Sequence, residues 1–204
     1  MTSIRDGRAG LGLGARAPVG PAAVLRRPTA AALCGLAAAA LLALAGCTPA
    51  LEWRELRADG RALVASFPCR PERRARSVAP DGASLTVSML SCSAGGNTYA
   101  IAFADVADPA AVTSGLDAWR QAATSNLGGA APVADLAASA VPGMTPNAKA
   151  GRVRIDGRLP NGATVVEQAM FFVHGLRIYQ ASVLGPTSSD AAATPFFSGL
   201  RLVP

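Results

Sequence analysis

The sequence predicts an α+β domain: a mostly antiparallel sheet, with a central amphipathic helix and a short C-terminal helix packed on one face. Three observations support this class. Segments in which apolar and polar residues alternate occur on both sides of one helical segment. That helical segment carries a single apolar stripe. Between two alternating segments stands Pro160-Asn161-Gly162, a turn that is typical of hairpins and therefore of antiparallel neighbours.

Residues 1–46 have the composition of a secretory signal peptide. Arg26 and Arg27 precede an apolar run of alanine and leucine from Thr29 to Leu44. This run is shorter than the about 20 residues of a membrane span and suits the apolar region of a signal peptide. Residues 1–46 carry a net charge of +4 and the rest of the chain only +2. The mature chain therefore gives no support for nucleic-acid binding.

Leu44, Ala45 and Gly46 stand directly before Cys47. This arrangement resembles the lipobox of bacterial lipoproteins, which implies cleavage by signal peptidase II and acylation of Cys47. Several acyl chains anchor a protein stably, whereas one chain binds membranes only marginally. The residue after the cysteine is Thr48 and not aspartate, which by the same resemblance implies sorting to the outer membrane, facing the periplasm. The alternative is an ordinary secretory signal that ends near a cysteine by chance.

We expect residues 47–60 to form the lipidated N-terminus and a tether, with Leu51, Trp53 and Leu56 as packing points. Residues 61–204 then form one domain, a length that suits a single core.

An even pair of cysteines, Cys69 and Cys92, follows Cys47. In an oxidising compartment such a pair predicts a disulfide, which would stabilise the fold by about 3 kcal/mol. Two unpaired buried thiols are the alternative. Cys92 is in phase with Leu90 and out of phase with Leu85, Val87 and Met89, so a bulge or change of face near Met89 is expected if the bridge lies in the core.

The first half of the domain reads as four strands. They are Ala62–Pro68, with Leu63, Ala65 and Phe67 on one face; Glu72–Val78, a charged edge strand; Ser84–Cys92; and Thr98–Val106, in which large residues (Tyr99, Ile101, Phe103) alternate with alanines. Pro80-Asp81-Gly82 and Gly95-Gly96-Asn97 predict the turns between them.

A helix follows, with Asp108 predicted as its N-cap and Pro109 as its first residue. Its stripe is Val112, Leu116, Trp119, Ala123 and Leu127, and Gly128-Gly129 ends it. The segment Ala130–Asn147 is ambiguous between helix and loop, because it is rich in alanine but contains three prolines.

The last third predicts a three-stranded meander and a terminal helix or turn. The strands are Gly151–Leu159, Thr164–Val173 and Leu176–Leu184. The terminal element spans Asp190–Leu202, and Pro195 allows a later helix start at Thr194.

Three short motifs carry a further resemblance: Phe67-Pro68-Cys69-Arg70-Pro71, Gly157-Arg158-Leu159-Pro160-Asn161-Gly162 and Phe196-Phe197-Ser198-Gly199-Leu200-Arg201-Leu202. The chain resembles uncharacterised small lipoproteins of Gram-negative bacteria. The element order from Arg61 to Val203 is also loosely similar to the PsbP-like superfamily, whose members are small accessory proteins. The resemblance implies a fold, but no catalytic residue.

Residues that could carry chemistry are sparse, so we expect neither an enzyme, nor a metal site, nor a cofactor. His174 is the only histidine and precedes Gly175 in a predicted turn. Asp105 and Asp108 lie close together, but the second is explained as a helix cap. Glu167 could be a lone buried acid, although a surface position is expected. No nucleophile elbow or phosphate-binding loop is present.

The charge cluster Arg70, Arg73, Arg74 and Arg76 is a candidate contact with an anionic lipid or polysaccharide surface. The alternative is a solvated edge strand that is protected from pairing with another sheet.

The expected function is that of a lipid-anchored, non-catalytic periplasmic module that binds or helps to assemble an envelope protein partner. A small-ligand-binding protein is the alternative. It would use a pocket between sheet and helix, with Trp119, Tyr99 and Phe103 as lining unless these aromatics are plain core. The oligomeric state is left open.

Overall fold

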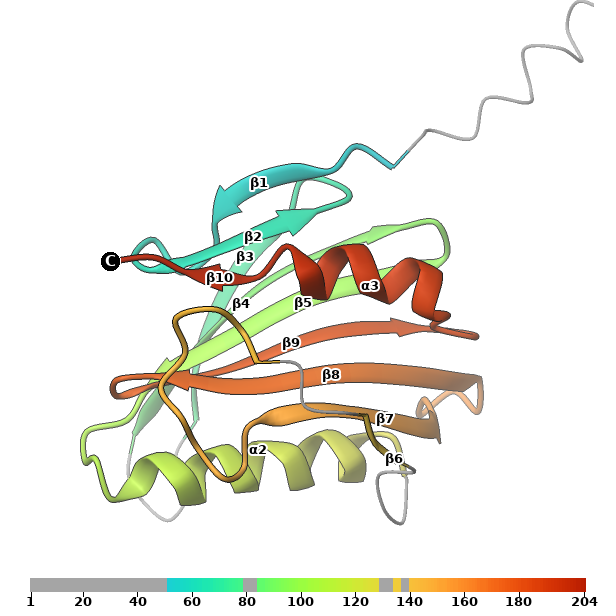
Figure 1. Cartoon of the computed structure of the whole chain (residues 1–204). Helices are drawn as coiled ribbons and strands as arrows, with labels where there is room; N and C mark the ends of the chain where they lie inside the picture. Colours follow the sequence, from blue (N-terminus) through green and yellow to red (C-terminus); the bar gives the residue numbers. More distant parts are fainter. Residues whose placement is uncertain (1–50, 79–83, 129–133, 137–139) are drawn as a thin grey trace, which may run out of the picture. The chain divides into compact units, whose positions relative to one another are not determined.

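Two antiparallel sheets and two helices make up the part of the chain that the computed structural model describes, residues 51–78, 84–128, 134–136 and 140–204 (Figure 1). The larger sheet has the spatial order β3 (Glu72–Val78), β4 (Leu85–Ala94), β5 (Asn97–Asp105), β9 (Arg177–Gly185), β8 (Thr164–His174), β7 (Gly151–Arg158) and β6 (Ala134–Leu136). The smaller sheet has the order β1 (Arg54–Arg57), β2 (Leu63–Phe67) and β10 (Arg201–Leu202). The helices are α2 (Ala111–Asn126) and α3 (Asp190–Ser198). The predicted α+β class is confirmed.

Both faces of the large sheet pack against other elements. The small sheet and α3 pack on one face, and α2 packs on the other. We expected the two helices on one face, and the central strand β8 explains why they lie on opposite faces. All nine residues from Val165 to Val173 are buried, so the strand needs apolar cover on both sides.

The strands of the first half follow the predicted ranges closely, and β3 lies at the predicted sheet edge. The domain begins earlier than the expected boundary at Arg61. Residues Arg54–Arg57, expected in a tether, pair with β2 as β1. Leu56 and Trp53 supply the reason, because both pack against the core below the small sheet. Gly95 and Gly96 form the tight turn before β5, whereas the predicted Pro80-Asp81-Gly82 turn lies outside the described residues.

The pairing of β4 is regular on both of its edges, so of the two expected alternatives near Met89 the strand shows the change of face and not the bulge. Leu85 and Val87 face the α2 side, while Leu90 and Cys92 face the small sheet. The apolar residues change from one face of β4 to the other along the strand. The first half of β4 is covered on the α2 side, and the second half is covered on the side of the small sheet.

Both helices differ from prediction at their ends. Helix α2 has Ala110 as N-cap, and the Asp108 carboxylate accepts a hydrogen bond from the Ala110 N–H (2.9 Å) in a turn just before it. Helix α3 starts at Asp190 and contains Pro195 in its interior, so the later start at Thr194 is wrong. It ends at Ser198, because Arg201 and Leu202 pair with β2 as β10. Among the described residues, no helix is long and apolar enough to cross a membrane.

Gly115 within α2 and Gly157 of β7, which lies against Leu127 at the end of the helix, test how tightly the helix packs. A Cβ on Gly115 would lie 3.6 Å from Ile178 Cδ1, an ordinary contact, so Gly115→Ala should stabilise the protein by about 0.5–1 kcal/mol. A Cβ on Gly157 would lie 2.5 Å from the carbonyl oxygen of Leu127, and Gly157→Ala should destabilise by about 1–3 kcal/mol. Urea denaturation measures both changes. Destabilisation by Gly115→Ala would mean that α2 packs closer to β9 than described.

Candidate functional site

A groove of about 860 Å³ lies between α2 and the large sheet. Its floor consists of residues of β3, β4, β5 and β9, and its wall of the face of α2 from Gly115 to Asn126. Most of the lining is apolar, with Arg76, Asn126, Glu167 and Gln180 as the polar members. Size and composition both fall in the range of small-molecule sites.

The groove arises because α2 covers the sheet unevenly. The helix makes most of its sheet contacts with β8 and β9. On that face, β3, β4 and the Ala102 region of β5 therefore form the floor of a groove and are not fully covered by the helix. The alanine face of β5 adds depth, since Ala102 contributes only a methyl group to the floor. Its cross-strand neighbours on that face are Met89 and Gln180, and Met89 is 37% exposed. A large residue at Ala102 would occupy the groove.

The three aromatic residues that we expected to line a pocket between sheet and helix lie on different sides of the sheet. Trp119 lines the groove from α2. Tyr99 and Phe103 lie on the opposite face of the sheet and are buried in its core, so they do not line the groove. There Tyr99 packs edge-on against Trp53 (5.9 Å between ring centroids) and Phe196 (5.5 Å).

The groove ends at a buried carboxyl group. Glu167 was expected at the surface, but the structure leaves it only 8% exposed. It pairs across strands with Leu184, and its Oε1 accepts a hydrogen bond from Gln180 Nε2 at 3.1 Å. Burial raises the pKa of Glu167, while hydrogen bonds from Ser182 and Gln180 oppose that rise. Its carboxyl group therefore stays neutral to a higher pH than a surface glutamate.

This raised pKa gives a pH-dependent prediction. Above the ordinary glutamate pKa, the unfolded chain loses the Glu167 proton while the folded protein retains it, so stability falls as pH rises towards the folded pKa. Glu167→Gln removes the effect and keeps an acceptor for Gln180. We expect the variant to be as stable as the parent near pH 4 and more stable at pH 7. Thermal unfolding at the two pH values measures the difference, and a variant that is less stable at pH 7 would refute the buried neutral carboxyl.

The arginine cluster does not present one common surface. Arg73 Nη2 donates a 2.7 Å hydrogen bond to the carbonyl oxygen of Ala58, and its guanidinium lies over the Phe103 ring. Arg74 forms a 3.0 Å ion pair with Glu72. Arg76 lines the groove, and Arg70 is exposed beside the disulfide residue Cys69. The alternation of β3 sends Arg73 to one side of the sheet and Arg74 and Arg76 to the other.

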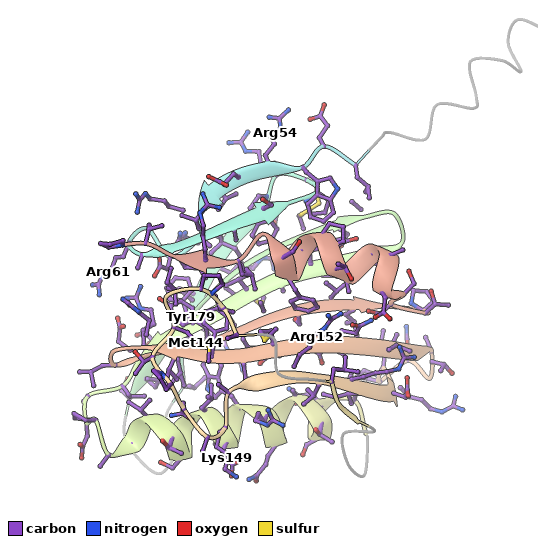
Figure 2. All side chains as sticks on the ribbon, in the orientation of Figure 1. Arg54, Arg61, Met144, Lys149, Arg152 and Tyr179 are labelled. Atoms are coloured by element: carbon purple, nitrogen blue, oxygen red, sulfur yellow. A yellow bond between two sulfur atoms is a disulfide. The ribbon has the colours of Figure 1, made fainter. Side chains whose placement is uncertain are left out.

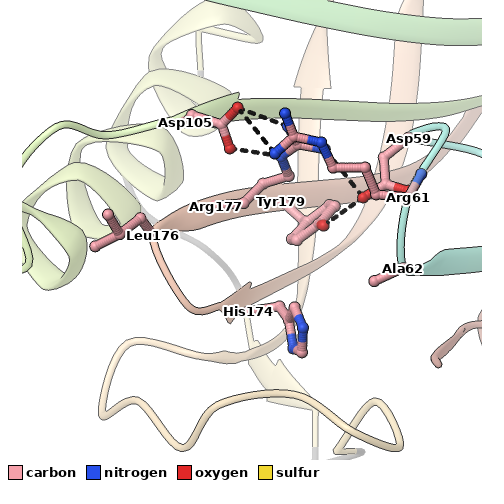
Figure 3. A pocket seen from close by; sticks show the side chains of 8 residues that line it. All are labelled: Asp59, Arg61, Ala62, Asp105, His174, Leu176, Arg177 and Tyr179. Atoms are coloured by element: carbon pink, nitrogen blue, oxygen red, sulfur yellow. Dashed lines mark hydrogen bonds and ion pairs between the residues drawn. The ribbon is translucent and has the colours of Figure 1, made fainter. Parts of the chain in front are cut away.

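A buried ionic network lies on the other side of the molecule, beside a small cavity of about 160 Å³ (Figure 3). Arg177 donates from Nε and Nη2 to the two oxygens of Asp105 (2.7 and 2.6 Å) and from Nη1 to Asp59 Oδ2 (3.1 Å). The Tyr179 hydroxyl donates to the same Asp59 oxygen at 2.7 Å. The backbone N–H groups of Arg61 and Leu63 donate to Asp59 Oδ1.

This network is structural in character. Burial acts to raise the pKa of Asp59, but the hydrogen bonds from Tyr179, from the two backbone N–H groups and from Arg177 together lower it. Hydrogen bonding to Asp105 raises the pKa of Arg177. Both charges are therefore held fixed at neutral pH. Asp59 lies in the turn between β1 and β2, so the network ties the small sheet to β5 and β9.

His174 and the cysteines were the other residues considered in the sequence as possible reactive groups or metal ligands. His174 ends β8 beside Gly175 (φ +58°), and its Nδ1 lies 3.2 Å from the carbonyl oxygen of Gly143. Within the described residues, no three histidine, cysteine or acidic side chains come together as a metal site would require. The disulfide joins Cys69 and Cys92 (S–S 2.08 Å), as its yellow bond in Figure 2 shows. Leu44, Ala45, Gly46 and Cys47 lie outside the described residues.

Sequence reasoning missed Asp59 and Arg177, and it misplaced Glu167. Asp59 precedes Gly60 and has the sequence context of a solvated turn. The available signal for the groove was the small side chain of Ala102, on the alanine face of the strand that the alternation predicts. Comparison of the chain with protein-family models, curated proteins and solved structures finds no match.

Proposed function

We propose that this protein is a lipoprotein of the outer membrane, anchored through Cys47 and facing the periplasm, whose domain binds a small, mostly apolar molecule without catalysing a reaction. The observation that carries the binding function is the apolar groove beside α2. The anchor rests on Leu44-Ala45-Gly46-Cys47 and the preceding apolar run.

The disulfide supports the proposed compartment. Disulfides persist in oxidising compartments such as the periplasm and are rare in the cytosol. Cys69 and Cys92 are bonded to each other. Of the other two cysteines, Cys34 lies within the apolar run of the proposed signal peptide, which leaves Cys47 as the cysteine for lipid. Labelling of cells with an alkyne-bearing fatty acid tests the anchor. The wild-type chain should incorporate the label, and Cys47→Ser should not. A labelled Cys47→Ser form would exclude this anchor.

The lining of the groove supports a binding function over a catalytic one. Burial of apolar ligand surface contributes about 25 cal/mol for each Å² removed from water, and the groove offers apolar side chains from both the sheet and α2. Its polar groups are few, and Glu167 and Gln180 already bond each other. They can orient a ligand, but they include no nucleophile beside a base.

Titration with N-phenyl-1-naphthylamine, a neutral dye that fluoresces in apolar sites, tests the groove. The wild-type protein should bind the dye saturably, and Ala102→Trp, which fills the floor, should weaken binding about tenfold or more. Ala122→Trp fills the groove from an exposed position of α2, where folding is insensitive to the change. Ala191→Trp, exposed on α3, adds the same bulk on the other face of the sheet. Equal binding by all four proteins would exclude the groove.

An envelope protein partner is a second candidate function, and the unpaired edge of β3 favours it. Six of the seven residues of β3 are exposed at the rim of the large sheet. A partner strand could pair with this edge. Crosslinking in cells, followed by a pull-down from solubilised membranes, should then recover a specific partner that Arg70→Glu with Arg74→Glu weakens. Recovery that does not change would remove β3 from consideration.

A further inference from the structure

We infer that the groove selects a single-chain amphiphile with an anionic head group, which pairs with Arg76 while the apolar chain lies along the floor beside α2. This inference rests on the proposed binding function and names the ligand class. It follows from three features of the groove: its length, the position of the one positive charge among its described lining residues, and the mostly apolar surface between its polar ends.

The groove is long in one direction. Its lining extends from Arg76 on β3 to Glu167 on β8, which are separated by four strand-to-strand steps of the sheet. At the usual strand spacing these four steps cover about 19 Å across the sheet. The two residues are also offset along the strands, because the register places Arg76 level with Val173 of β8. Small-molecule pockets of similar volume also hold compact ligands, but a groove of this length and apolar floor matches an extended hydrocarbon chain better.

Arg76 is a positive charge available to a ligand. It lies on the groove side of β3, directly opposite Val87 of β4. Among the described residues it has no ion pair or hydrogen bond, whereas Arg74 on the same side is paired with Glu72. A guanidinium group presents its N–H donors in a fork that matches the oxygens of a carboxylate or a phosphate.

The rest of the lining does not compete with an anion at Arg76. The lining residues nearest to it are apolar: Val78, Val87 and Leu85. Arg74, two residues before it on the same side of the strand, is paired with Glu72. Glu167 lies at the opposite side of the groove, bonded to Gln180, and burial raises the pKa of its carboxyl. The groove therefore has one cationic end and an apolar middle, the charge complement of an anionic amphiphile.

Displacement of bound N-phenyl-1-naphthylamine by four amphiphiles with the same sixteen-carbon chain tests this inference. They are palmitate, hexadecyl phosphate, hexadecanol and hexadecyltrimethylammonium, each used below the concentration at which it aggregates or separates from solution. The variants are wild type, Arg76→Gln and the matched control Arg74→Gln. Both substitutions are at exposed positions of the same strand and leave the core intact.

We expect wild type to bind at least one anionic amphiphile about tenfold or more tightly than hexadecanol, and the cation most weakly. Arg76→Gln should abolish this preference and leave hexadecanol binding unchanged, and Arg74→Gln should resemble wild type. Preference for palmitate or for hexadecyl phosphate then identifies a carboxylate or a phosphate head. Equal affinity for all four chains, or a preference that survives Arg76→Gln, overturns the inference while the binding function stands. A protein that binds no dye overturns both.

Discussion

Replacement of Asp59 with alanine should lower the free energy of unfolding by about 3–5 kcal/mol, the largest effect that we expect from one side chain. The Asp59 side chain is 1% exposed and accepts hydrogen bonds from Arg177, Tyr179 and two backbone N–H groups. Its removal leaves these donors buried, and it leaves Arg177 with Asp105 as its remaining carboxylate partner. Chemical denaturation of the two proteins measures the change.

Asp156→Ala is the matched control, because Asp156 forms a single, partly exposed ion pair with Arg154 (3.1 Å) and should contribute about 1 kcal/mol or less. The effect of Asp59 should also depend on pH. Its folded-state pKa lies below the ordinary aspartate value, so its stabilisation is present above about pH 4 and is lost as the pH falls further. An Asp59→Ala protein as stable as the Asp156→Ala control would show that the network does not hold the small sheet.

Removal of the disulfide should be the second-largest effect, a loss of about 3 kcal/mol in the Cys69→Ala, Cys92→Ala double variant. The bridge closes a loop with a sequence separation of 23 and connects the chain after β2 to β4 of the large sheet. Denaturation of the wild-type protein in the presence and absence of a reductant provides a second measurement. The reduced wild type should match the double variant, and a wild type that reductant does not affect would indicate unbonded thiols.

The ionic network and the disulfide both attach the small sheet to the large sheet. Asp59 lies before β2 and Cys69 after it, so the network and the bridge fasten opposite ends of the same strand to the large sheet. When either the ionic network or the disulfide is lost, the attachment of the small sheet should depend more strongly on the one that remains. We therefore expect the combined variant to lose more stability than the sum of the separate losses.

Local patterns predicted most elements of this fold. Alternation located β2 to β5, the Pro160-Asn161-Gly162 turn located the β7–β8 hairpin, and the three- and four-residue spacing located α2. These signals depend on neighbouring residues, which the sequence shows directly. The same local logic failed at Pro195, because packing of Phe196 and Phe197 into the core keeps the proline inside a helix that propensity alone would end.

The groove and the ionic network could not be predicted from the sequence, because both depend on contacts between residues that are far apart in the chain. The stripe of α2 predicts which side of the helix is buried. It does not predict that the helix lies mainly over β8 and β9 and leaves Ala102 of β5 in the floor of a groove. Glu167 was expected at the surface because polar residues in mixed strands usually are; its burial follows from the central position of β8 between β7 and β9. Arg177 and Asp59 are 118 residues apart, and no local pattern connects them.

Native mass spectrometry of the protein released from its own membranes tests the central claim, that the groove holds a small apolar ligand, most directly. The wild-type protein should carry a bound molecule that solvent extraction removes, and Ala102→Trp should carry much less of it, while the Ala191→Trp control retains it. A wild-type protein without a bound molecule, or the same molecule on Ala102→Trp in equal amount, would contradict the claim that the groove beside α2 is the functional site.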